Sequence, residues 1–170
     1  MDEQRDHVAA ILDAWRAERP GLDVSPVAIF GRITRIERYQ AAAAREVWRR
    51  HRLDSGEYDV LAALSRSGPD HRLTPTELYR SVLVSSATMT ERLDRLERRG
   101  FITRRPAGRD RRSVLIELTP AGRAVFDQAH PDLLATEATL LDGLSRQDHT
   151  ALSRLLAKLA ANLETKNKLA

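Results

Sequence analysis

The chain contains no cysteine and no long apolar segment. Without thiols it can form neither disulfides nor sulfur-based zinc sites, and it lacks a thiolate nucleophile or redox sensor. No run approaches the roughly 18–20 uncharged apolar residues that a membrane-spanning helix needs, and the first residues lack the basic and then apolar pattern of a signal peptide. We therefore expect a soluble, cytoplasmic protein without a membrane partner.

Catalytic and metal-binding motifs are also missing. No two histidines have the i, i+4 spacing that places two imidazoles on one helix face, so we expect all five to be solvated surface residues: His7, His51, His71, His130 and His149. The sequence has no Gly-rich phosphate loop and no serine on a strained strand-to-helix turn. These absences predict a protein that is not an enzyme and that holds neither a metal nor a cofactor.

Lysine is scarce, since 25 of the 28 basic residues are arginine, and the arginines are concentrated. Residues 92–112 hold nine arginines and three acidic residues, a local charge of +6, whereas the rest of the chain sums to about −2. A focused positive patch on a near-neutral body is typical of proteins that bind the phosphate backbone of nucleic acids. A merely solvated charged face would need more interleaved lysine and glutamate than this window contains.

Apolar periodicity predicts long helices at both ends of the 170-residue chain. A first helix with Trp15 on its apolar stripe ends at Pro20, and a second, capped by Ser25, runs to His51. A final helix capped by Ser145 carries a stripe of leucines at positions 152, 155, 156, 159 and 163. Their apolar surface exceeds what one small domain can cover, which favours pairing of two subunits in a homodimer.

The middle of the chain has the pattern of a winged helix. Residues 54–57 and 74–77 read as capping boxes, and Ser85 can cap a further helix that ends at Gly100. Strand-like residues 101–103 and 114–118 flank an arginine-rich turn, which predicts a β-hairpin wing. The expected fold is mainly α with a small β-hairpin wing: N-terminal helices over 1–52, a winged helix-turn-helix DNA-binding domain over 53–119 and C-terminal dimerisation helices over 120–170.

Four motifs within residues 53–123 resemble the MarR family of winged-helix transcriptional regulators. They are residues 73–78 (LTPTEL), 89–102 (MTERLDRLERRGFI), 110–113 (DRRS) and 118–122 (LTPAG). The resemblance implies an obligate homodimer. Its recognition helices would enter successive major grooves of a pseudo-palindromic double-stranded DNA operator, and its wings would reach the flanking minor grooves.

The N-terminal part narrows this resemblance. An added helix with Trp15, followed by residues 22–26 (LDVSP) and 31–32 (GR), is similar to the urate-responsive branch of the family. That likeness implies a site for urate or a related small anion. The site would be formed by Trp15, Asp59, Arg92 and Arg104.

Small hydroxyl residues and the wing arginines are the candidate DNA contacts. Short side chains on the first turns of the recognition helix allow close approach to phosphates and base edges: Ser85, Ser86, Thr88 and Thr90. At the wing, Arg109, Arg111 and Arg112 can enter a narrow minor groove, whose negative potential attracts arginine. Alternatively, Ser85 is only a helix cap, and Arg112 pairs with Asp110 to stiffen the wing.

The anion site suggests a switch. An entering monoanion would bridge the guanidinium groups and repel Asp59, moving the helix that carries Arg92, while Trp15 stacks on a flat purine. The plainer interpretation makes Asp59 and Arg92 an ordinary ion pair, Arg104 a phosphate clamp and Trp15 a core residue. The resulting hypothesis is a DNA-binding regulator, most simply a repressor, attenuated by urate. The alternatives are a MarR-type regulator of another phenolic or antibiotic compound, and a winged-helix adaptor that binds protein.

Overall fold

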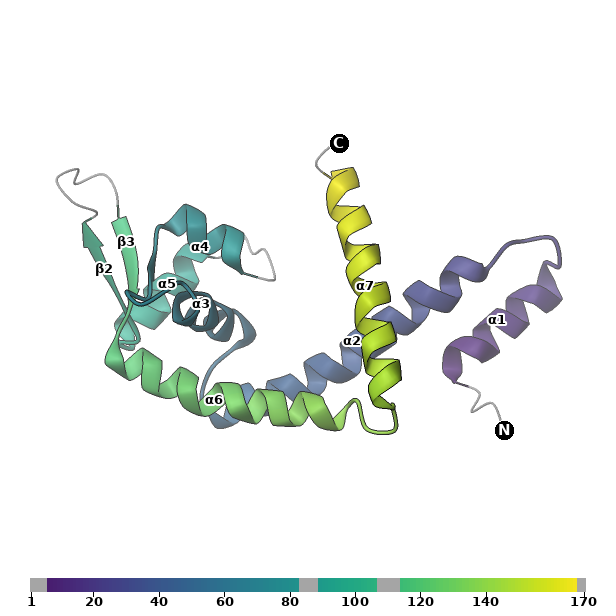
Figure 1. Ribbon diagram of the computed structural model, residues 1–170, viewed down its shortest axis with the longest axis horizontal. Helices are drawn as coiled ribbons and strands as arrows, with labels where there is room; N and C mark the ends of the chain where they lie inside the picture. Colours follow the sequence, from purple (N-terminus) through teal and green to yellow (C-terminus); the bar gives the residue numbers. More distant parts are fainter. Residues whose placement is uncertain (1–5, 83–88, 107–113, 168–170) are drawn as a thin grey trace.

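The computed structural model describes residues 6–82, 89–106 and 114–167. Two N-terminal helices, α1 (His7–Glu18) and α2 (Ser25–Arg50), precede an α/β module formed by the middle of the sequence. The module comprises α3 (Ser55–Ser65), β1 (Arg72–Leu73), α4 (Pro75–Ser81), α5 (Met89–Arg98), β2 (Ile102–Pro106) and β3 (Val114–Leu118). It is followed by α6 (Pro120–Thr139) and α7 (Arg146–Asn167). Figure 1 shows the module at one end of the molecule and α1 at the other. The expected mainly helical fold with a small wing is confirmed.

Helix boundaries follow local capping chemistry. The predicted capping box opens α3, because the Asp54 carboxylate accepts from the Glu57 N–H at 2.8 Å and Glu57 accepts from the Asp54 N–H at 3.1 Å. The box predicted at residues 74–77 likewise opens α4. The prediction for Ser25 is wrong: Val24 is the N-cap of α2, and Ser25 donates its N–H to the Asp23 carboxylate at 2.9 Å.

The wing belongs to a three-stranded antiparallel sheet with the order β1-β3-β2. Its hairpin pairs Ile102 with Leu118 and Pro106 with Val114, and the tip at residues 107–113 lies outside the described part. The short strand β1 was not predicted. It pairs Arg72 with Glu117 on β3, a long-range contact with no local sequence signature.

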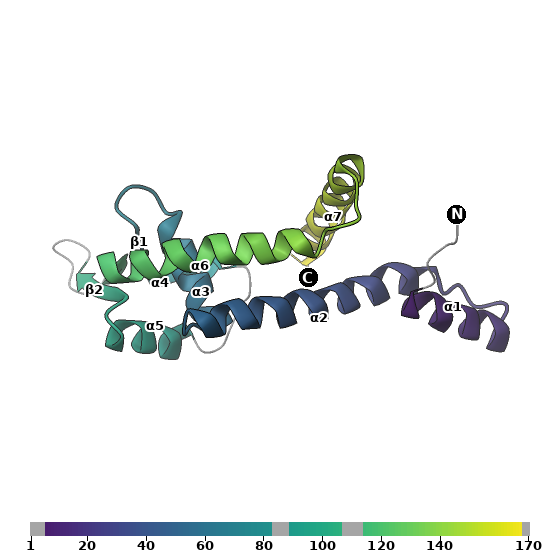
Figure 2. The same cartoon turned by 90° about the horizontal axis from the view of Figure 1, so that it is seen from below.

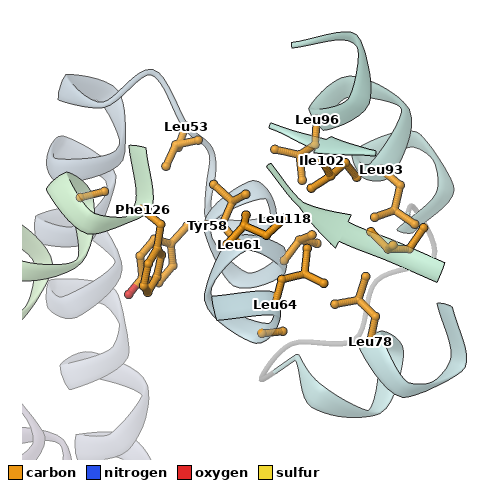
Figure 3. Packing of buried hydrophobic residues seen from close by; sticks show 14 of the residues in the cluster. Leu53, Tyr58, Leu61, Leu64, Leu78, Leu93, Leu96, Ile102, Leu118 and Phe126 are labelled. Atoms are coloured by element: carbon orange, nitrogen blue, oxygen red, sulfur yellow. The ribbon is translucent and has the colours of Figure 1, made fainter. Parts of the chain in front are cut away.

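The core is built around α3. Figure 3 shows Leu61 and Leu64 of α3 lying between Phe126 of α6 on one side and Leu78, Leu93, Leu96 and Ile102 on the other. The α4 and α5 helices and the sheet therefore pack on one side of α3 and α6 on the opposite side. On the side of α5 away from α3, Thr90, Glu91, Asp94 and Arg98 are exposed.

The two ends of the chain have little core of their own. Helix α1 packs on α2 through a small cluster of Val8, Leu12 and Val24. Helix α7 stands apart from α2 in Figure 2, and most of its leucines are exposed, with Leu155 57% accessible. Within the described ranges, no helix combines the length and apolarity needed to cross a bilayer.

Three of the five histidines are not free surface residues, which corrects the sequence expectation. They are only partly exposed and hydrogen-bonded within the fold. The ring of His51 lies 2.8 Å from the Asp132 carboxylate, and Nδ1 of His130 lies 2.7 Å from the Tyr58 hydroxyl. Arg123 donates to His71 at 2.7 Å. His7 and His149 are exposed as expected.

Candidate DNA-reading surface and effector site

Helix α5 is attached to α3 by a buried carboxylate. Glu57 is only 5% exposed, and it accepts a hydrogen bond from Arg99 at 2.8 Å and lies 3.5 Å from Arg95. Arg95 also pairs with Asp54 at 2.7 Å. The acidic first turn of α3 thus holds the C-terminal half of α5. This network sets the position of α5, the predicted recognition helix, which we call the reading helix.

Most of the described arginines in residues 92–112 are paired with acids. Arg104 pairs with Asp94 at 2.6 Å and with Glu97 at 2.5 Å, and Arg105 pairs with Glu117 at 2.7 Å. Four of the carboxylates that pair with this window lie outside it: Asp54, Glu57, Glu91 and Glu117. Counting them lowers the local charge from +6 to +2. The expected positive patch is therefore partly neutralised by tertiary contacts that a sequence window cannot show.

The predicted DNA-contact residues are described only in part. Thr90 is exposed on the first turn of α5, where its hydroxyl is available to a partner. The other six lie outside the described residues: Ser85, Ser86, Thr88, Arg109, Arg111 and Arg112. Arg98, on the exposed side of the same helix, donates to the carbonyl of Asp94.

Arg92 and Asp59 lie close enough to influence each other electrostatically. The Arg92 guanidinium packs against Gly56, and its Nη1 is buried without a hydrogen-bond acceptor. Asp59 follows Gly56 by about one turn of α3. Burial raises the pKa of the Asp59 carboxyl above its ordinary value, although Arg92 and Arg66 oppose the rise. No hydrogen bond or ion pair joins Arg92 to Asp59 among the described contacts, so they are not the ordinary pair that the plainer interpretation expects.

The structure does not bring the other two predicted ligand residues into this group. Arg104 is held by Asp94 and Glu97. Trp15 is 43% exposed on α1, and Figures 1 and 2 both place α1 at the end of α2 that is remote from α3. One chain therefore assembles Asp59 and Arg92 without Trp15.

Sequence reasoning missed a cavity of about 470 Å³ between α3 and α6. Asp59 lines it, together with the rings of Tyr58, Phe126 and His130 and the side chain of Arg66. Burial raises the pKa of Tyr58 to about 12, helped by the nearby charges of Glu137 and Asp59, so this hydroxyl stays protonated. Four of these residues were not predicted, because the pairing of α3 with α6 creates the cavity.

The helix-turn-helix elements, the wing and the exposed α5 define a winged-helix DNA-binding protein. Residues 53–113 match the model of the MarR family. The chain is 34% identical over 156 residues to the HTH-type transcriptional regulator PecS of Dickeya dadantii, covering 92% of this chain and 94% of that protein. The chain belongs to the MarR family of transcriptional regulators, which bind DNA and are not enzymes.

Solved structures show the same fold. The MarR family regulator Sco3205 of Streptomyces coelicolor, determined in complex with DNA, superposes with a TM-score of 0.74 at 20% identity, over 84% of this chain and 90% of that one. BpsR of Bordetella bronchiseptica, whose DNA binding is regulated by 6-hydroxynicotinic acid, gives a TM-score of 0.69 at 23% identity, over 78% of this chain and 92% of that one.

Proposed function

We propose that the chain acts as a homodimeric regulator whose affinity for operator DNA is lowered by a small planar anion such as urate. The observation that carries the proposal is the buried, unpaired Nη1 of Arg92 beside Asp59. A buried guanidinium N–H without an acceptor costs free energy that an entering anion would recover. A cavity of about 470 Å³ between α3 and α6, lined by Asp59 but not by Arg92, is large enough for a purine-sized ligand.

The proposed switch acts through α5. An anion that accepts from Arg92 places negative charge near Asp59, and the two like charges repel. Arg92 belongs to the reading helix and Asp59 to α3, so the ligand changes the preferred position of one helix against the other. The ion pairs from Glu57 to Arg95 and Arg99 favour the original position. Operator affinity then depends on which set of contacts is stronger.

Arg104 and Trp15 have conditional roles in this proposal. Arg104 is held by Asp94 and Glu97, and it can bind the anion only after exchanging one of these contacts. Trp15 lies at the far end of α2 from its own Asp59. A stacking tryptophan would therefore come from the second copy of the chain.

The homodimer is supported by apolar side chains that a single chain leaves in water. On α7 these are Leu152, Leu155, Leu156 and Leu163, and on α2 they include Ile29, Phe30 and Ile36. Burying one such side chain contributes about 1.5–3 kcal/mol. A two-fold interface that covers α7 and these apolar side chains of α2 would remove this surface from solvent.

A second candidate effector is a phenolic or other aromatic acid. The cavity favours it because three of the lining side chains are aromatic rings, and the ring of His130 stacks on Phe126 at a centroid distance of 4.9 Å. BpsR, similar in fold, responds to such an acid. Competition between urate and 6-hydroxynicotinic acid for the protein would rank the two candidates.

Calorimetric titration with urate tests the proposal directly. The wild-type dimer is expected to bind urate, and Arg92→Gln is expected to bind it at least about tenfold more weakly, because one charge-assisted hydrogen bond is worth about 1.5–3 kcal/mol. Arg19→Gln, a change at the exposed arginine that caps the C-terminus of α1, serves as the matched control and should bind like wild type. Equal urate affinity in Arg92→Gln and wild type would overturn the assignment of Arg92.

A further inference from the structure

Helix α2 carries a second concentration of arginine. Residues 32–50 of this helix contain six arginines and two glutamates, a net charge of +4. The net charge summed over all residues outside 92–112 does not reveal this segment, because acidic residues elsewhere in the chain cancel its positive charge. None of the residues assigned to DNA or effector binding belongs to it.

Four of the arginines share one face of the helix, whereas Arg32 pairs with Asp6 and Arg50 lies 3.6 Å from Asp132 on another face. At 100° per residue, Arg35, Arg38, Arg45 and Arg49 fall within one sector of α2, on the opposite side from the buried Ala44 and Val47. We call these four residues the α2 arginine stripe. A hollow of about 500 Å³ lies along it, lined by its first three members and by neighbouring side chains of the same helix.

Most of the stripe lacks an acidic partner. Arg38 and Arg45 are exposed, and no ion pair holds either of them within the described residues. Arg35 donates to the Tyr39 hydroxyl at 3.0 Å, which leaves its charge uncompensated. Only Arg49 is paired, with Glu46 at 2.6 Å. The stripe therefore differs from the arginines of α5 and β2, most of which are neutralised within the chain.

The stripe faces the same side of the molecule as the reading helix. The buried residues of α2 pack toward α6, so the stripe points away from α6. In Figure 2, α6 runs above α3 and α2, whereas α5 lies below α3 and beyond the C-terminal end of α2. A duplex bound against α5 would therefore run along the side of α2 that carries the stripe.

We infer that the α2 arginine stripe contacts the phosphates of duplex DNA between the two recognition helices of the dimer. The inference rests on the proposed dimer and on DNA binding through α5. Recognition helices in successive major grooves lie about 34 Å apart, and a 26-residue helix is about 39 Å long, so α2 has the length to follow this central segment. Arginine suits the role because its planar guanidinium can donate two hydrogen bonds to one phosphate.

A salt series on DNA affinity tests the inference, with Arg38→Gln, Arg45→Gln and the double variant compared with Arg19→Gln. Each phosphate contact contributes about −0.9 to the slope of log K against log salt concentration. Because both subunits of the dimer carry the changes, the double variant loses four contacts and should show a slope less steep by about 3.6. It should also bind operator and unrelated duplexes more weakly by a similar factor, because phosphate contacts are independent of sequence. Arg19→Gln should retain the wild-type slope.

Three results would overturn the inference. An unchanged slope in the double variant, with wild-type DNA binding and effector response intact, would remove the stripe from the DNA interface and leave the proposed regulator standing. Dissociation of the double variant into monomers in sedimentation would identify the stripe as a protein–protein surface instead. Absence of salt-dependent DNA binding by the wild-type protein would contradict the regulator and the stripe together.

Discussion

The guanidinium of Arg92 occupies the space beside Gly56 that the Cβ of any other residue would need. A Cβ on Gly56 would lie 2.1 Å from Cζ of Arg92. The missing side chain lets an arginine of the reading helix lie directly on the first turn of α3, one turn before Asp59. This close approach places a buried, unpaired N–H of Arg92 where an anion can use it.

Gly56→Ala is therefore expected to impair effector binding without unfolding the protein. The clash involves the end of a flexible side chain, which can move, and alanine is a better helix former than glycine. We expect the free energy of unfolding to change by less than about 1 kcal/mol while urate affinity in calorimetry falls about tenfold or more. Gly21→Ala, where a Cβ would meet nothing within 4 Å, is the control and should bind like wild type.

Gly122→Ala should behave in the opposite way. Its Cβ would lie 2.1 Å from the backbone oxygen of Phe101, which cannot move without disturbing the junction of β2 and α6. Overpacking of this kind costs about 1–3 kcal/mol. Chemical denaturation should show that loss in the free energy of unfolding, and a stability equal to wild type would mean that the two segments are less tightly packed than the structure shows.

Glu57→Gln tests the attachment of α5 to α3. The change removes the negative charge with which both Arg95 and Arg99 interact. Because both arginines are about one-third exposed, we expect the free energy of unfolding to fall by roughly 1–3 kcal/mol, which is less than for a fully buried ion pair. Operator affinity should fall as well, because α5 is less well positioned. Glu91→Gln, which removes an exposed partner of Arg95, should cost under about 1 kcal/mol. Equal effects of the two variants would argue against a special role for Glu57.

Asp59→Asn separates switching from basal DNA binding. The variant lacks the charge repulsion proposed to drive the switch, so its operator affinity should be nearly that of wild type while its attenuation by urate is reduced. A gel-shift titration with and without urate measures both quantities. Undiminished attenuation in the variant would exclude Asp59 as the trigger.

The same variant has a predicted pH dependence of stability. Burial raises the pKa of Asp59 above 3.8, so the folded protein binds more protons than the unfolded chain in the window above that value, and stability falls as the pH rises through it. At pH 7 the wild type carries this penalty and Asp59→Asn does not. The variant should therefore unfold at a higher temperature at pH 7, and the difference should vanish well below pH 3.8.

Local chemistry made much of the fold predictable. The capping boxes at residues 54–57 and 74–77 satisfy backbone N–H groups within four residues of sequence, so their patterns identify helix starts reliably. The prediction of Ser25 as the N-cap was wrong because the carboxylate of Asp23 accepts the hydrogen bond from the Ser25 N–H. The strand β1 escaped prediction because its two residues acquire their conformation only by pairing with β3.

The site was less predictable because tertiary contacts define it. The sequence indicated Asp59 and Arg92 through family resemblance. Neither the close approach of Arg92 to Gly56 nor the cavity between α3 and α6 has a sequence pattern. The charge of residues 92–112 was overestimated because acids such as Glu57 reach it from other elements. The α2 arginine stripe, in contrast, follows helical spacing and could have been found by examining the charge of each predicted helix separately.

The most direct test of the account uses an operator that the protein itself selects from random-sequence DNA. The dissociation constant of the wild-type dimer for this operator is measured with increasing urate at fixed ionic strength. Coupling between effector and operator sites typically amounts to about 1–3 kcal/mol, so the account predicts that urate raises this constant about 5- to 150-fold. A dissociation constant that stays unchanged up to millimolar urate would contradict it.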